Sequence, residues 1–158
     1  MTQTTEGLAF TKATVWYSDD AKVSWVNISG EGAAVAPSGG ERAAGEQNTF
    51  DGALPIVKGG DRAGTTLTVR FVYTEEADPK PFDALRIVHE SETAAIHVQY
   101  APGGIPAAGE TGFWFHADGI LTNLTYPGGE AGPGDPILCE FVVKCAALTK
   151  ADASIDAV

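Results

Sequence analysis

Histidine and cysteine, the side chains that most often carry chemistry, are few in this 158-residue chain. The three histidines are His89, His97 and His116, and none stands at a metal-ligand spacing from a cysteine or another histidine. We interpret His97 and His116, each within a strand-like stretch, as residues of a polar strand face. The histidines therefore predict no metal site, no cofactor site and no catalytic site.

The two cysteines, Cys139 and Cys145, both lie in the run ILCEFVVKC. If this run is one strand, they are about 20 Å apart at ~3.3 Å per residue. A disulfide needs Cα atoms within about 7 Å, so the two cannot pair with each other. Their even spacing places both on one face, beside Ile137, Phe141 and Val143. We expect buried free thiols rather than a redox or metal role.

The acidic residues Glu75, Glu76 and Asp78 could in principle hold calcium or act as a general acid and base. Acidic residues before a helix explain them without a ligand, and this interpretation is favoured. The glycine pairs lack the strand-loop-helix context and the Lys-Ser/Thr ending of a phosphate-binding loop. No GxSxG nucleophile motif is present. The sequence therefore predicts that the protein is not an enzyme.

The composition predicts one soluble globular domain over residues 1–158, with 44% hydrophobic and 20% charged residues. No apolar run approaches the ~20 residues that span a bilayer, and the N-terminus lacks a secretory signal pattern, so we expect assembly in a cytoplasm and no membrane partner. The net charge of −11 repels nucleic acid. It is typical either of ordinary solubility or of a surface that faces DNA without binding it.

The elements around these residues are mostly strands. Their β-branched and aromatic content and their turn signals indicate about seven, in an antiparallel β-sandwich or barrel. Residues 149–158 are expected to frame an edge or remain mobile. The expected strands are Ala13–Ser18 and Lys22–Ser29 (a hairpin), Thr65–Thr74, Ala94–Pro102, two short strands around a turn at Asp118-Gly119, and Pro136–Leu148.

One helix is predicted, over about 78–90. Asp78 is a good N-cap and Pro79 suits the first helical position. Phe82, Leu85 and Val88 form one apolar stripe, and a helix of about 12 residues must dock that stripe on a sheet to be stable. These three are the candidate helix-packing residues.

The segment from Gly30 to Gly64 is dense in Gly, Ala and charge. A structureless loop of this length is uncommon inside a compact domain. The short pieces EQNTF and ALPIVK read as extended, so we predict a long hairpin-like arm over about 30–64. Its apolar residues fit no core pattern.

The order of strand TVRFVYTE, helix PFDALRIVHE, strand VQYAPGG, then FHADGILTNLTYPGG and GDPILCEFVV resembles the major tail tube protein of long-tailed bacteriophages, prophages and gene-transfer-agent particles. The resemblance covers roughly Gly30 to Leu148. It implies a β-sandwich or barrel with a flanking helix that forms hexameric rings, which stack into a hollow cylinder. Sheets of all subunits would join around the channel, the helix would help fix adjacent subunits, and the arm would contact the next ring.

In that reading, Phe50, Leu54, Pro55, Ile56 and Val57 become candidate inter-ring contacts. The alternative is a small cluster that folds back on its own domain. The implied function is a structural subunit of a virion tail, assembled in the host cytoplasm, with an acidic lumen through which DNA passes without specific binding. The implied partners are further copies of the chain and the tape-measure, tail-terminator and tip proteins.

Two other functions stay open on the sequence. One is a carbohydrate-binding or adhesin-type β-sandwich, which would need an exposed aromatic platform. The other is a secretion-system tube protein, which is physically similar but exports effectors. The candidate platform residues are Trp16, Trp25, Trp114 and Tyr126.

Overall fold

The computed structural model describes residues 13–47, 55–75, 81–105, 112–128 and 134–151. This part of the chain is mainly antiparallel β-structure with one α-helix, as the sequence predicts. The elements are β1 (Thr14–Ser18), β2 (Val26–Asn27), β3 (Gly32–Gly39), β4 (Arg42–Gln47), β5 (Ile56–Arg62), β6 (Thr65–Val72), α1 (Pro81–Glu90), β7 (Ala95–Ala101), β8 (Trp114–Thr125) and β9 (Leu138–Ala151).

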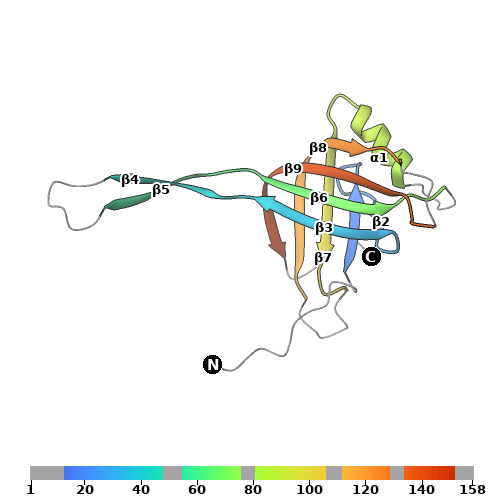
Figure 1. The fold of residues 1–158 in the computed structure, drawn as a ribbon, viewed down its shortest axis with the longest axis horizontal. Helices are drawn as coiled ribbons and strands as arrows, with labels where there is room; N and C mark the ends of the chain where they lie inside the picture. Colours follow the sequence, from blue (N-terminus) through green and yellow to red (C-terminus); the bar gives the residue numbers. More distant parts are fainter. Residues whose placement is uncertain (1–12, 48–54, 76–80, 106–111, 129–133, 152–158) are drawn as a thin grey trace, which may run out of the picture.

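Seven strands form one sheet in the order β2-β1-β7-β8-β9-β6-β3, which we call the main sheet. β4 and β5 form a separate two-stranded sheet. In Figure 1, β3 and β6 run across β1 and β7, because the main sheet curls on itself as a half-barrel. The long strands β8 and β9 join the two halves, and β8 carries two register shifts of the kind that bend a strand.

The core lies inside this curl. On β6, Leu67, Val69 and Phe71 are buried, while Arg70 on the other face is exposed. This is the half-buried alternation that the sequence predicts for the strand. Each such side chain contributes roughly 1.5–3 kcal/mol when fully buried.

The last strand confirms the prediction for the cysteines and corrects its start. Cys139 and Cys145 are free and buried, next to Phe141 on the inner face of β9. Ile137, expected on the same face, is 45% exposed and precedes the strand. Its carbonyl accepts a hydrogen bond from the Tyr73 N–H at 2.8 Å, but the first buried residue of β9 is Cys139.

The C-terminal end of β9 also differs from expectation. The sequence predicts that this strand ends at Leu148 and that residues 149–158 form a tail. In the structure β9 continues to Ala151, which pairs with Trp114 on β8. Residues 152–158 of the predicted tail lie outside the described residues.

The predicted hairpin at Asp118-Gly119 is wrong, because β8 is one continuous strand. Gly119 lies opposite Cys145 at a bulge in the β8–β9 ladder. A Cβ at this position would lie 2.8 Å from the Lys144 carbonyl carbon and 3.1 Å from the Cys145 Cα. The glycine therefore permits two backbones to approach closely. Glycine inside a strand often marks such an approach, because it has no side chain.

The predicted strand over 22–29 shrinks to the two residues of β2, which pair with β1 as the expected hairpin partner. Its first half is taken up by a turn around Asp20. The Asp20 carboxylate accepts hydrogen bonds from the backbone N–H groups of Ser24 and Val23 at 2.9 and 3.1 Å. The Ser24 hydroxyl and backbone hydrogen bonds, with one from the Ser18 hydroxyl, lower the pKa of Asp20 to about 2.

Helix α1 lies against the main sheet with one apolar face. Phe82, Leu85 and Val88 are buried. The Phe82 ring makes edge contacts with Tyr73 and Tyr126, with centroids 5.6 and 5.3 Å away. Such pairs add about 0.5–1.5 kcal/mol beyond area burial. The predicted N-cap and first helical residue, positions 78 and 79, lie outside the described residues.

The arm is shorter than the predicted 30–64. Gly32–Gly39 is β3, which pairs with β6 and belongs to the main sheet. The reason is that Val35 at its centre packs against the core, a contact that the Gly/Ala composition hid. The part that projects consists of β4, β5 and their connections to the body, which Figure 1 shows extending away from the main sheet. We use "arm" below for this part, residues 40–64.

Candidate assembly surfaces

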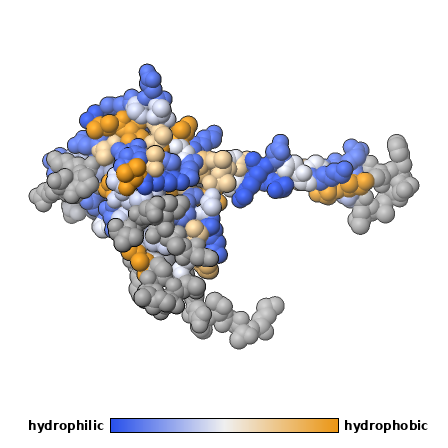
Figure 2. Space-filling model, turned by 180° about the vertical axis from the view of Figure 1, so that it is seen from behind, coloured by the Kyte–Doolittle hydropathy of each residue, from blue (hydrophilic) through white to orange (hydrophobic). Residues whose placement is uncertain are grey.

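The arm has no core of its own. Every residue of β4 and β5 is exposed. Ile56 and Val57 at its distal end are 51% and 63% exposed, and Figure 2 shows hydrophobic surface at this end. Of the candidate contact residues, Pro55 lies beside them, while Phe50 and Leu54 lie outside the described residues.

Hydrogen bonds join the two chain segments at the base of the arm. The Gly40 N–H donates to the Gly64 carbonyl at 3.1 Å, and the Ala63 N–H donates to the Glu41 carbonyl at 2.7 Å. The Arg62 Nε donates to the Gly40 carbonyl at 2.9 Å. The ladder of β3 and β6 therefore continues into the arm, which reaches roughly 23 Å from Gly40 to the end of β4 at ~3.3 Å per residue.

One edge of the main sheet is the outer side of β3, which pairs with β6 on its other side. The Gly40–Gly64 hydrogen bond sets the alternation of the ladder, so residues 34, 36 and 38 direct their backbone groups to β6. Val35 and Pro37 direct theirs outward. Pro37 has no N–H to offer there, and proline is typical of edge strands.

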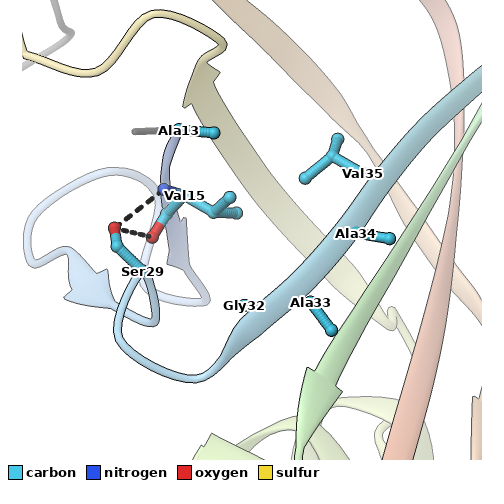
Figure 3. Close-up of a pocket in the computed structure, with 7 residues that line it drawn as sticks. All are labelled: Ala13, Val15, Ser29, Gly32, Ala33, Ala34 and Val35. Carbon is cyan, nitrogen blue, oxygen red and sulfur yellow. Dashed lines mark hydrogen bonds between the residues drawn. The ribbon is translucent and has the colours of Figure 1, made fainter. Parts of the chain in front are cut away.

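The two ends of the main sheet face each other across a cavity of about 330 Å³, which we call the seam cavity (Figure 3). Val15 on β1 and Val35 on β3 point toward one another across it. The β1 side is already paired, because Val15 N–H donates to the Ser29 hydroxyl at 2.9 Å and Val15 carbonyl accepts from Ile28 N–H at 3.0 Å. The curl of the main sheet thus brings β1 and β3 to the same cavity without a hydrogen-bonded ladder between them. The lining residues are Ala13, Val15, Ser29, Gly32, Ala33, Ala34 and Val35.

The outer face of β6, β9 and β8 is open and nearly balanced in charge. Arg70 and Glu140 form an ion pair at 3.1 Å. Asp118 pairs with Lys22 at 2.8 Å, and Lys144 adds one exposed positive charge. The acidic excess of the chain therefore does not lie on the described strands of this face. Its other residues include Thr66, Thr68, Val72, Ile120, Thr125 and Val142.

Asp118 joins three elements at the edge of this face. Its two carboxylate oxygens accept hydrogen bonds from Lys22 Nζ and His97 Nδ1, each at 2.8 Å. Burial alone would raise the pKa of Asp118, but these two hydrogen bonds outweigh burial, and the pKa is lowered from its ordinary value. His97 is therefore a structural partner on a polar strand face. The same prediction is wrong for His116, which is buried on β8.

The four aromatic residues of the sugar-binding hypothesis do not form an exposed platform. Trp114 is 3% exposed, and Trp16 and Trp25 are half-buried. Tyr126 is exposed, but its ring packs on Phe82. A carbohydrate-binding face therefore has no support in their arrangement.

The described residues contain no group of three or more His, Cys, Asp or Glu side chains placed to hold a metal ion. Of the acidic run before the helix, Glu75 accepts a hydrogen bond from the Tyr73 hydroxyl at 3.1 Å, while Glu76 and Asp78 lie outside the described residues. Within the described ranges, no helix has the length and apolarity to cross a membrane. The surfaces with a distinctive shape are thus the arm, the β3 edge, the seam cavity and the outer sheet face.

No protein-family model matches the chain, and no curated protein matches it in sequence. Among solved structures, the chain is similar to a chain of the anti-feeding prophage tube-terminating cap (TM-score 0.69, 12% identity, 97% of this chain and 96% of that one). It is also similar to a chain of the PVC sheath-tube complex, an extracellular contractile injection system in the extended state (0.64, 14%, 94% of each). A third similar structure is the tail of an empty GTA particle with C6 symmetry (0.58, 14%, 94% and 100%).

At sequence identities of 12–14%, these similarities show a shared fold. Over nearly its whole length, the chain has the fold of proteins found in the tubes, caps and tails of phage-like particles. This is the class that the sequence resemblance names.

Two of the four surfaces were missed by sequence reasoning. The seam cavity depends on the curl of the sheet, which brings β1 and β3 together from distant parts of the chain. The small-residue run Gly32-Ala33-Ala34 was its visible signal. The charge balance of the outer face depends on the ladder registers, and no sequence pattern gives these.

Proposed function

We propose that the chain is a structural subunit of a tail tube, in which six copies form a ring and rings stack into a hollow cylinder. The observation that carries this proposal is the arm, a hairpin with every strand residue exposed and with apolar side chains at its end. Such a hairpin gains nothing from burial in its own domain, and isolated two-stranded hairpins are marginal in water. Contact with another copy supplies the missing burial.

The main sheet supports the ring. An open antiparallel sheet leaves unpaired edge groups, which proteins usually protect. Pairing the β3 edge with a strand of another copy would protect it. The C6 symmetry of the structurally similar GTA tail supports six copies.

One face of the main sheet must then line the channel. The inner face of β6 and β9 is buried in the core, so the outer face is the one available. This changes the acidic lumen expected from the net charge. We propose a wall on which Arg70 and Asp118 are each neutralised by a partner, so that a polyanion finds few unpaired cations to bind.

The proposed partners are further copies of the chain, with tape-measure, terminator and tip proteins at the ends of the tube, and the proposed location is the tail of a particle. DNA or another cargo would pass without specific binding. A tube that exports effectors is the second candidate, because two of the similar structures belong to an injection system and to an anti-feeding prophage. Genes next to this one distinguish the two: capsid, portal and tape-measure genes indicate a virion, and a secretion cluster indicates export.

Replacing Gln47–Lys58 with two glycines tests the proposal. The core lies in the main sheet, so the variant should keep its circular dichroism spectrum and melting temperature but fail to form tubes that sediment. A matched pair refines the test: Val57→Ser should weaken assembly, whereas Val23→Ser, at a valine that is 84% exposed on the body, should not. Long tubes from the arm-deleted protein would show that the arm assignment is wrong.

A further inference from the structure

An arm that leaves its own domain needs a receiving surface on another. We propose that the seam cavity is this surface: Val57 of one copy enters the cavity between β1 and β3 of a second copy, with Ile56 and Lys58 at its rim and Lys58 beside Glu31. This inference rests on the proposed tube, in which the arm is the contact between successive rings.

The cavity has room for an aliphatic side chain. Its volume is about 330 Å³. Ala13, Ala33 and Ala34 leave the space open, and Val15 and Val35 provide apolar walls (Figure 3). The cavity opens to solvent, so an aliphatic occupant would remove its own apolar surface and that of Val15 and Val35 from water.

The backbone on both sides is ready for strand addition. Val35 and Pro37 direct their backbone groups away from β6, at an edge with no neighbour in the main sheet. β5 pairs with β4 alone in its two-stranded sheet, so its outer edge is also open. An extended segment that adds to an exposed sheet edge gains main-chain hydrogen bonds, and pockets for alternate side chains provide specificity.

The charges are complementary at the proposed contact. Glu31 lies in the turn between Ser29 and Gly32, two residues that line the cavity. Its Oε2 atom is buried without a hydrogen-bond partner among the described residues, and burial raises the pKa of this carboxyl. Lys58 follows Val57 directly and is exposed. An approaching lysine ammonium would stabilise the charged form of this half-buried carboxyl.

The charge of the whole arm favours the same contact. Residues 40–64 carry four acidic and three basic side chains, a net charge of −1. The rest of the chain carries 17 acidic and seven basic side chains, a net charge of −10. Two bodies therefore repel each other, while a nearly neutral arm can approach a body at little electrostatic cost.

The contact must join different copies. The arm continues in the direction of β3, away from the seam cavity of its own domain (Figure 1). From Val35 to Gln47 the chain spans 12 residues, or about 40 Å in extended form. An arm from one copy that enters a cavity on the next is a heterologous contact, which propagates along an axis rather than closing on a pair.

Cross-linking tests the pairing directly. Subunits carrying Ala33→Cys are mixed with subunits carrying Val57→Cys, assembled, and treated with a short bis-maleimide. The two native cysteines are buried and should not react. Ser38→Cys is the matched control, because Ser38 is exposed on the same strand roughly 17 Å from Ala33. We expect a covalent dimer with Ala33→Cys and none with Ser38→Cys.

Two further variants test the contact by assembly. Val35→Phe fills the cavity, and should leave a folded monomer by circular dichroism whose critical concentration for assembly rises at least tenfold. Glu31→Lys and Lys58→Glu should each raise the critical concentration, and subunits that carry both should recover it.

The outcomes separate the two claims. If the wild-type protein forms neither rings nor tubes, the proposed function fails. If the wild-type protein forms tubes but Val35→Phe assembles equally well and Val57→Cys cross-links to Ser38→Cys instead, the tube stands and the seam cavity is not its acceptor.

Discussion

Replacing Gly119 with alanine should cost this protein far more stability than a glycine-to-alanine change usually does. Gly119 lies opposite Cys145 on β9, at the bulge that helps bend the main sheet. An added Cβ would stand 2.8 Å from the Lys144 carbonyl carbon and 3.1 Å from the Cys145 Cα. Both neighbours are backbone atoms of a central strand, so neither can turn aside as a side chain would.

The magnitude follows from these distances. Carbon atoms in ordinary contact are about 3.5–4.0 Å apart, and the Lys144 carbonyl oxygen is nearer to the added Cβ than either carbon, so the two strands must separate by roughly 1 Å. Overpacking of this kind typically costs about 1–3 kcal/mol. We expect about 3 kcal/mol, because the bulge connects both halves of the half-barrel. For a chain of this size that corresponds to a melting temperature lower by roughly 6–12 °C.

Thermal unfolding followed by circular dichroism measures the effect, with Gly45→Ala as the control. Gly45 lies on the exposed strand β4, and its added Cβ would meet nothing nearer than the Lys58 carbonyl oxygen at 3.9 Å. The control should melt within about 2 °C of the wild-type protein. If Gly119→Ala melts together with the control, the close approach of β8 and β9 is not real and the explanation of the curl fails.

Three other predictions concern the helix, the β1–β2 turn and the thiols. Phe82→Ala should lower the free energy of unfolding by about 3–5 kcal/mol, because it removes a buried ring, while Ile87→Ala on the exposed side of α1 should change it by less than about 0.5 kcal/mol. Denaturant titration measures both values, and equal losses would contradict the packing of α1 on the sheet. Asp20 has a folded-state pKa of about 2, below its ordinary 3.8, so the stability that it contributes is present above about pH 4 and is lost as the pH falls toward 2. Asp20→Asn should therefore make the melting temperature depend less on pH over this range, and an unchanged pH dependence would refute the assignment. Cys139 and Cys145 should react with a thiol reagent only after denaturant is added, because they are buried and burial raises their pKa values; rapid labelling of the native protein would contradict this.

The sequence was sufficient where a local pattern reports a local environment. β6 alternates because one face meets the core, and α1 carries its apolar stripe because one side packs on the sheet. The free, buried cysteines followed from strand geometry alone. These features depend on neighbours that any fold of this class would supply.

The errors arose where one signal has two physical causes. Asp118-Gly119 is typical of a hairpin turn, but the glycine here serves a close approach to the following strand, β9. The run from Gly32 to Gly39 resembles the arm in composition, yet its single large apolar residue, Val35, packs against the core and draws the run into the main sheet. In both cases the deciding contact comes from another strand, so no local window contains it.

Electron microscopy of the purified wild-type protein tests the central claim most directly. The claim is that the open sheet and the unsupported arm are completed by further copies of the same chain. Negative-stain images at increasing protein concentration should show rings with six-fold averages, and then tubes of roughly 10 nm width, as domains of this size predict. Single particles of monomer size at every concentration, with no rings or tubes, would contradict the account.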